Sequence, residues 1–80
     1  MTVDPRLSVT IADLQRELIV ECLNIAAVKA RHAVDDIMLG DDECAGRSIE
    51  IAILNLREVA KAWRQLQALE AATKAIERPA

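Results

Sequence analysis

Apolar residues recur every three or four positions through the first half of this chain, which is the period of an α-helix with one buried side. Thr10 followed by Asp13 has the spacing of a weakened capping box, so the helix is predicted to begin at residue 10. Gly40 can take the left-handed conformation that ends a helix, which predicts a helix over residues 10–39. The stripe best suited to contact a second helix, with spacings that alternate between four and three, consists of Ile19, Leu23, Ala26, Ala30, Ala33 and Ile37.

The second half of the chain has an apolar stripe of the same period. Asp41, Asp42 and Glu43 can accept the free backbone N–H groups of a helix start, so a second helix is predicted over residues 42–75. Ser48 is a rival cap, which would begin that helix later. The stripe, with spacings that alternate between three and four, consists of Ile49, Ala52, Leu56, Val59, Trp63 and Leu66.

Two stripes of equal period on either side of one glycine predict an all-α fold, namely an antiparallel two-helix hairpin that forms a single domain of residues 1–80. Folding the chain at Gly40 pairs the stripes in layers, such as Ile37 with Ala45, Ala26 with Leu56, and Ile19 with Trp63. The apolar period is weak at both ends of the chain. Residues 1–9 are therefore predicted to form a loose arm and residues 76–80 a frayed tail.

Each predicted helix carries further apolar residues outside its stripe, and two helices cannot cover both sets. They are Ile11, Leu14, Leu18 and Ile25 on the first helix, and Ile51, Leu54, Ala62, Leu69 and Ile76 on the second. A homodimer in which two hairpins form a four-helix bundle would cover them. Trp63 is as consistent with the hairpin core as with the dimer contact. The candidate interface residues are Leu14, Leu18, Ile25, Leu54, Trp63 and Leu69.

Composition and charge narrow the possible functions. A chain of 80 residues buries a smaller share of its surface than a larger domain does, so an isolated fold would be marginal and a partner is expected. The net charge of −3 and the pI of about 5.0 disfavour a general affinity for nucleic acid or for an anionic membrane. The first residues lack the pattern of a signal peptide, and no run of 18 residues is free of charge. We therefore expect a soluble, cytoplasmic protein that does not contact membranes.

The residues able to carry chemistry are few and scattered. Cys22 and Cys44 fit no ligand spacing, and in a hairpin they lie roughly 20 Å apart at about 1.5 Å per residue, which excludes a disulfide between them. His32 with Asp35 and Asp36 has the spacing of a possible ligand pair, although a metal site there would need further ligands from the second helix. The alternating acids of a calcium loop are absent, so we interpret these residues as a solvated polar face with helix-capping acids. We expect no metal, no cofactor and no enzymatic activity.

A basic stripe on the second helix is the one candidate site for an anion. Arg57, Lys61 and Arg64 share one helix side, and dimer symmetry would double them. Glu50 and Glu58 lie close by, which favours a solvated, mutually paired surface. The stripe leaves open an alternative function, the binding of RNA or of an anionic nucleotide.

In size and layout, residues 10–69 resemble several families of small helical-hairpin regulators: Rop-type RNA-binding dimers, quorum-sensing anti-activators, and phage-encoded proteins that antagonise host defence. The likeness is one of architecture, and it carries over no functional residue. It implies a regulator that works by binding. We expect a small regulatory or adaptor protein that acts stoichiometrically on another protein, as an inhibitor or anti-activator does.

Overall fold

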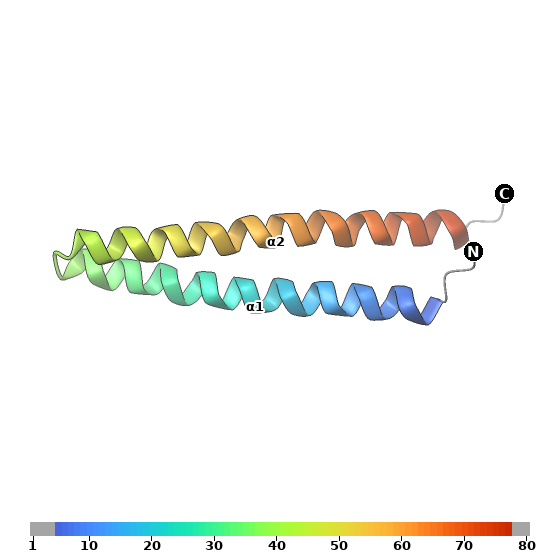
Figure 1. The fold of residues 1–80 in the computed structure, drawn as a ribbon, viewed down its shortest axis with the longest axis horizontal. Helices are drawn as coiled ribbons and strands as arrows, with labels where there is room; N and C mark the ends of the chain where they lie inside the picture. Colours follow the sequence, from blue (N-terminus) through green and yellow to red (C-terminus); the bar gives the residue numbers. More distant parts are fainter. Residues whose placement is uncertain (1–4, 78–80) are drawn as a thin grey trace.

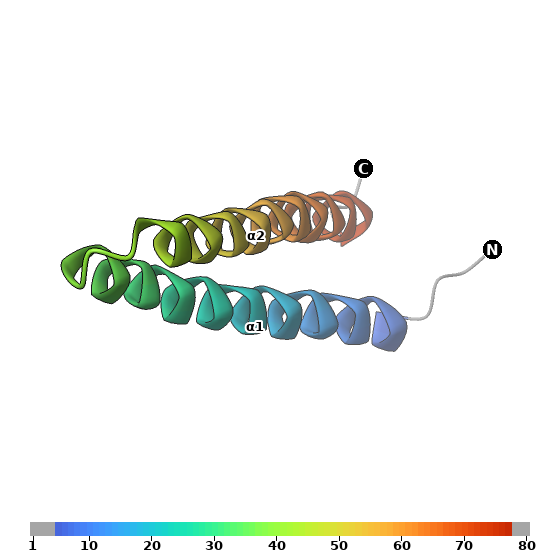
Figure 2. The same ribbon diagram turned by 60° about the vertical axis from the view of Figure 1, so that its left-hand side comes forward.

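Two antiparallel helices joined by a tight turn make up the fold (Figure 1). The structure is a computed structural model that describes the backbone of residues 5–77 and the side chains of residues 10–76. Helix α1 spans Pro5–Met38 and helix α2 spans Asp42–Glu77. The helices lie side by side along a rod of 61 × 19 × 16 Å, and the start of α1 and the end of α2 lie at the same end (Figures 1 and 2). The all-α hairpin predicted from the sequence is confirmed.

The helices are longer than their apolar stripes. Helix α1 begins at Pro5, so residues 5–9, which the sequence assigned to a loose arm, are helical. Proline suits the first position of a helix because its fixed φ is already helical and its missing N–H would have no partner there. Helix α2 continues to Glu77 with Lys74 in its last turn, where a cation interacts favourably with the helix dipole. Residues 1–4 and 78–80, the remainder of the predicted arm and tail, lie outside the described residues.

The turn confirms the role predicted for Gly40, whose φ is 81°. The N–H of Asp41 donates to the carbonyl of Asp36 at 2.8 Å, and the N–H of Gly40 donates to the carbonyl of Ile37 at 3.1 Å. These two hydrogen bonds are those of a Schellman motif with glycine in the left-handed position. A residue with a Cβ would be strained in this conformation.

Asp41 also starts the second helix. Its Oδ1 accepts the backbone N–H of Cys44 at 3.1 Å, which is the bond of an N-cap residue to the third residue of its helix. The acidic side chains of Asp42 and Glu43 occupy the first turn, where the helix dipole favours negative charge. The rival start at Ser48 is wrong, because Ser48 lies inside α2 and is buried.

Small side chains line the contact between the helices, which we call the seam. Its buried residues are Ala12, Cys22, Ala26 and Ala33 on α1, and Ala45, Ser48, Ala52, Ala62 and Leu66 on α2. Half-buried residues fill the alternating intervals of three and four, namely Gln15, Ile19, Lys29 and Asp36 on α1, and Asn55, Val59, Leu69 and Thr73 on α2. Leu66 is the one large apolar side chain among the buried residues of the described part of the chain. Polar residues in such a seam specify its register at a cost in stability.

The seam is rotated away from the predicted stripes. Leu23 and Leu56 were expected to pack between the helices, yet they are 42% and 48% exposed. Trp63, which the sequence left open between the hairpin core and the dimer contact, is 50% exposed. The predicted stripes share only part of their residues with the seam, and on each helix their centre lies about 50° from the centre of the seam at 100° per residue. The sequence prediction followed the largest side chains. The hairpin instead brings together the narrower strip of small residues, which allows the two helices to approach closely.

Candidate interaction faces

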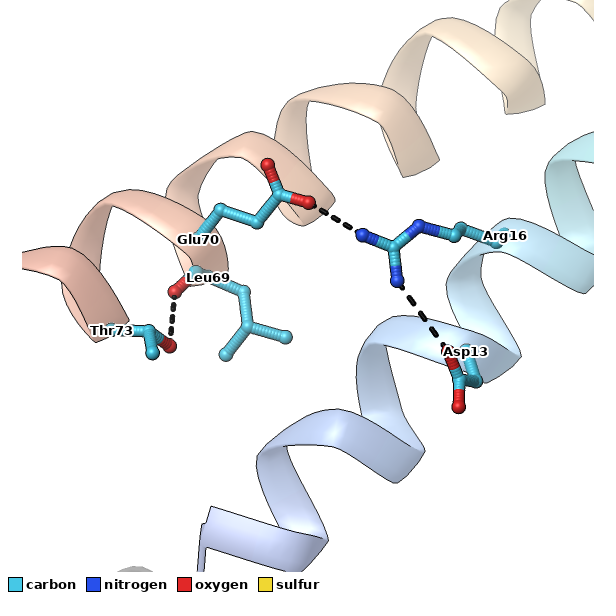
Figure 3. Close-up of polar contacts among 5 residues, drawn as sticks. All are labelled: Asp13, Arg16, Leu69, Glu70 and Thr73. Atoms are coloured by element: carbon cyan, nitrogen blue, oxygen red, sulfur yellow. Dashed lines mark hydrogen bonds and ion pairs between the residues drawn. The ribbon is translucent and has the colours of Figure 1, made fainter.

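The two flanks of the hairpin, on either side of the seam, can be told apart by polar contacts between the helices. On one flank, Nη2 of Arg16 donates to Oε1 of Glu70 at 2.6 Å, and Nη1 of Arg16 lies 3.5 Å from Oδ1 of Asp13 (Figure 3). On the other, Nε2 of Gln15 donates to Oε1 of Gln65 at 3.2 Å. Residues seven apart share one side of a packed helix, so each contact identifies the residues of its flank.

The flank that carries the Arg16–Glu70 pair becomes entirely apolar toward the turn. Seven residues along each helix from this pair stand Leu23 and Trp63, and 21 residues along stand Ile37 and Ile49. We call this surface the apolar face. Its large side chains, 42% to 57% exposed, are Val20, Leu23, Val34, Ile37, Ile49, Ile53, Leu56 and Trp63. The heptad positions between them hold Ala27, Ala30 and Ala60, so no charged residue interrupts the face.

Apolar and polar residues alternate along the opposite flank, which we call the mixed face. Its large exposed side chains are Ile11, Leu14, Leu18, Ile25 and Val28 on α1, and Ile51 and Leu54 on α2. Polar residues at equivalent heptad positions interrupt it, namely Glu21, His32 and Asp35 on α1, and Arg47, Glu58, Lys61 and Gln65 on α2. Both flanks therefore expose large apolar groups, but only one presents them without a break.

The structure distributes the predicted interface residues over three sides of the hairpin. The mixed face carries Leu14, Leu18, Ile25 and Leu54, and the apolar face carries Trp63. Leu69 is half-buried in the seam, and Ala62, also expected to be in excess, is buried there. Most of the apolar face was instead expected to be core. Its period was visible in the sequence, but the side of each helix that meets the other was not.

The basic stripe of Arg57, Lys61 and Arg64 lies on α2 away from the seam, and all three side chains are exposed. Nε of Arg64 donates to the carbonyl of Ala60 at 3.2 Å. Within the part of the chain that the structure describes, none of the three forms an ion pair. A shallow depression lined by Glu50, Ile53, Leu54 and Arg57 borders the stripe, and a single helix forms it. Among the described residues, no hydrogen bond or ion pair joins α1 to these cations.

The two cysteines are free thiols in different surroundings. Cys22 is buried in the seam, and Cys44 is half-buried in the first turn of α2. The pKa of the Cys44 thiol is raised, first by its hydrogen bond to the Asp41 carboxylate and then by the charge of that carboxylate. The same thiol hydrogen bond, together with the Cys44 N–H, lowers the pKa of Asp41. The acidic cap thus disfavours the thiolate that a reactive cysteine needs.

The side chains of residues 10–76 contain no group of three His, Cys, Asp or Glu placed to hold a metal ion. Neither α1 nor α2, as far as they are described, has a stretch long and apolar enough to cross a bilayer.

Comparison with known proteins adds no relative. The sequence matches no family model, no curated protein and no solved structure.

Proposed function

We propose that this protein is a small cytoplasmic regulator or adaptor that acts by stoichiometric binding to another protein, and that it does so as a homodimer of two hairpins in a four-helix bundle. The observation that carries the proposal is the apolar face, which is unbroken by charge and about half exposed. The role is binding rather than catalysis. Two free thiols fit the reducing environment of the cytoplasm.

The direction of the apolar stripes supports a four-helix bundle. In a square bundle each helix faces the common core about 45° away from the line to its hairpin neighbour. The stripes with the largest side chains are turned about 50° from the seam at 100° per residue, toward the apolar face. Seam and apolar face together give each helix the three apolar positions per heptad that a bundle core needs.

The size of the apolar face also suits self-association. Covering the exposed half of its eight large side chains contributes about 1 kcal/mol for each side chain. Two copies together then contribute on the order of 15 kcal/mol, which is comparable with the roughly 4 to 15 kcal/mol that association costs. The seam alone buries one large apolar side chain, so the hairpin has much to gain from a second copy.

A dimer through the apolar face leaves the mixed face open for another protein. Leu14, Leu18 and Ile25 follow one another on α1 at intervals of four and seven, which is the spacing of anchors that meet a partner helix. Leu54 lies on the same flank of α2 and is 57% exposed. In this proposal the protein binds its partner stoichiometrically by burying these side chains against it.

Light scattering during size exclusion tests the dimer. We expect a mass of twice the 8.8 kDa of one chain, falling to a single chain for the variant Ile49→Glu, because the glutamate would be buried in the bundle core. A wild-type protein that stays monomeric at high concentration would refute the assembly.

Affinity capture from the native host tests the role of the mixed face. The wild type is compared with Leu54→Glu, which should keep the dimer mass and lose the specific partner. Binding that is retained by Leu54→Glu, or that is lost only together with the dimer, would contradict a partner site on the mixed face.

A second candidate function, the binding of RNA or an anionic nucleotide, rests on the basic stripe. Its three cations form no ion pair with described residues, and the proposed dimer leaves them exposed. The diagnostic is salt: phosphate contacts weaken steeply as the salt concentration rises, whereas an apolar contact does not. Neutralising Arg57, Lys61 and Arg64 together to glutamine should abolish such binding and leave the dimer intact.

A further inference from the structure

The apolar face is not centred on the hairpin. On α1 it runs from Val20 to Ile37, and on α2 from Ile49 to Trp63, so that it adjoins the turn. The open end of the same flank is polar, with Asp13, Arg16, Gln67 and Glu70 at the equivalent heptad positions. A second copy therefore meets a surface with an apolar half and a charged end.

A two-fold axis can relate two copies face to face in two ways. If it runs along the rod, both turns lie at the same end, and α1 of each copy packs beside α2 of the other. If it crosses the rod, the turns lie at opposite ends, and each helix packs beside its own equivalent. The asymmetry of the apolar face distinguishes these arrangements.

Opposed turns are costly at either of their two registers. In the fully overlapped register, a two-fold axis through the midpoints of α1 and α2 places Glu70 of one copy against Ile49 of the other. It also places Arg16 against Ala27. Both charged side chains then lose water without gaining a partner of opposite charge. Sliding the copies until the apolar stretches coincide avoids this contact. It then leaves about 14 residues, or roughly 20 Å, of each open end unpaired at 1.5 Å per residue.

We propose that the two copies pack with their turns at the same end, so that Arg16 and Glu70 of both copies form a ring of four alternating charges at the open end. The inference rests on the proposed homodimer and specifies its geometry. Apolar positions then meet apolar positions from Ile37 to Val20, and the helices overlap along their whole length. Each helix has antiparallel neighbours on both sides.

The existing ion pair is suited to such a ring. Arg16 contacts Glu70 at 2.6 Å and Asp13 at 3.5 Å, and its side chain is 52% exposed on the apolar-face flank (Figure 3). A guanidinium has five N–H donors, so donors are left for Glu70 of the second copy. Exposed ion pairs add little stability, and the ring acts mainly by disfavouring other orientations and registers.

Distances between spin labels on the dimer test the orientation. The label is attached at Ile76→Cys, near the open end and 83% exposed, in a chain that also carries Cys22→Ala and Cys44→Ser. With the turns together, the two labels differ only in their lateral position and lie within about 30 Å. With the turns opposed, helical rise alone separates them by about 50 Å at the fully overlapped register and by about 70 Å at the displaced one. The shorter distance supports the proposal and the longer one overturns it.

Heterodimer formation tests the charge ring. One variant carries Arg16→Glu and the other carries Glu70→Arg, so that each homodimer has four like charges at its open end. With the turns together, mixing should give heterodimers well above the half expected for random pairing, and 1 M salt should reduce the excess. Random pairing at low salt overturns the ring.

The proposed function is judged separately. A dimer that pairs at random, or that has distant labels, leaves the homodimer standing and removes the orientation. A wild-type chain that remains monomeric removes both.

Discussion

Leu56→Ala and Leu54→Ala remove the same groups from neighbouring positions of α2, one on each face of the hairpin. Leu56 is 48% exposed on the apolar face, and Leu54 is 57% exposed on the mixed face. Burying a whole leucine side chain contributes about 1.5 to 3 kcal/mol, so covering the exposed half of Leu56 contributes about 1 kcal/mol. A two-fold interface contains the substitution twice. Leu56→Ala should therefore weaken the dimer by roughly 1.5 to 3 kcal/mol, or about 10- to 100-fold in Kd.

Sedimentation equilibrium over a dilution series, or the concentration dependence of thermal unfolding, measures this Kd for the wild type and both variants. Leu54→Ala should change it less than about threefold, because the mixed face stays in solvent in the proposed dimer. Equal losses from the two variants would mean that the apolar face does not define the interface. A larger loss from Leu54→Ala would assign self-association to the mixed face and refute the reasoning.

The remaining predictions concern the hairpin itself. Gly40→Ala should destabilise the hairpin by about 1 kcal/mol in urea unfolding, because φ is 81° there although no atom lies within 4 Å of the added Cβ. Gly46 lies in helical backbone with equal space for a Cβ, so Gly46→Ala should stabilise the hairpin by about 0.5 to 1 kcal/mol in the same assay. Leu66→Ala should cost about 2 to 4 kcal/mol in the same assay, since its side chain is 2% exposed, and a loss below about 1 kcal/mol would contradict the described seam. The pKa of Asp41 is lowered in the folded chain, so the contribution of its carboxylate to stability is complete above the ordinary carboxyl pKa and is lost as the pH falls through the lower, folded value. Asp41→Ala should therefore lower Tm at pH 7, and the difference in Tm between the variant and the wild type should shrink toward pH 2. Alkylation of Cys44 at pH 8 should be slow in the wild type, because the Asp41 carboxylate raises the thiol pKa, and faster in Asp41→Ala, with equal rates arguing against the thiol hydrogen bond.

Local residue chemistry was sufficient for the turn. Gly40 was predicted to leave the helix in a left-handed conformation, and the acidic run was predicted to begin the second helix; both hold in the structure. Such features depend on a few neighbouring residues and their backbone bonds, which is why a single sequence reveals them. The start of α1 at Pro5 was not predicted, because the apolar period that marks a buried helix face is weak before Ile11.

The faces were harder to assign than the helices. Leu23 and Leu56 were placed between the two helices because they are large members of well-spaced stripes, yet they lie on the apolar face. The small and polar residues that fill the seam, such as Ser48 and Asn55, gave little sign of their position. The prediction that the hairpin has more apolar surface than it covers does not depend on this choice, and the exposed side chains on both flanks agree with it.

The sequence by itself determined that the chain forms two amphipathic helices, where the chain turns, and that apolar residues exceed what one hairpin hides. Those properties follow from the helical period and from local capping, which act within a few residues. Only the tertiary structure decided which part of each apolar arc faces the other helix. An apolar arc wider than one line of helix contact is compatible with several rotations, and the choice among them depends on how closely side chains from distant parts of the chain can pack.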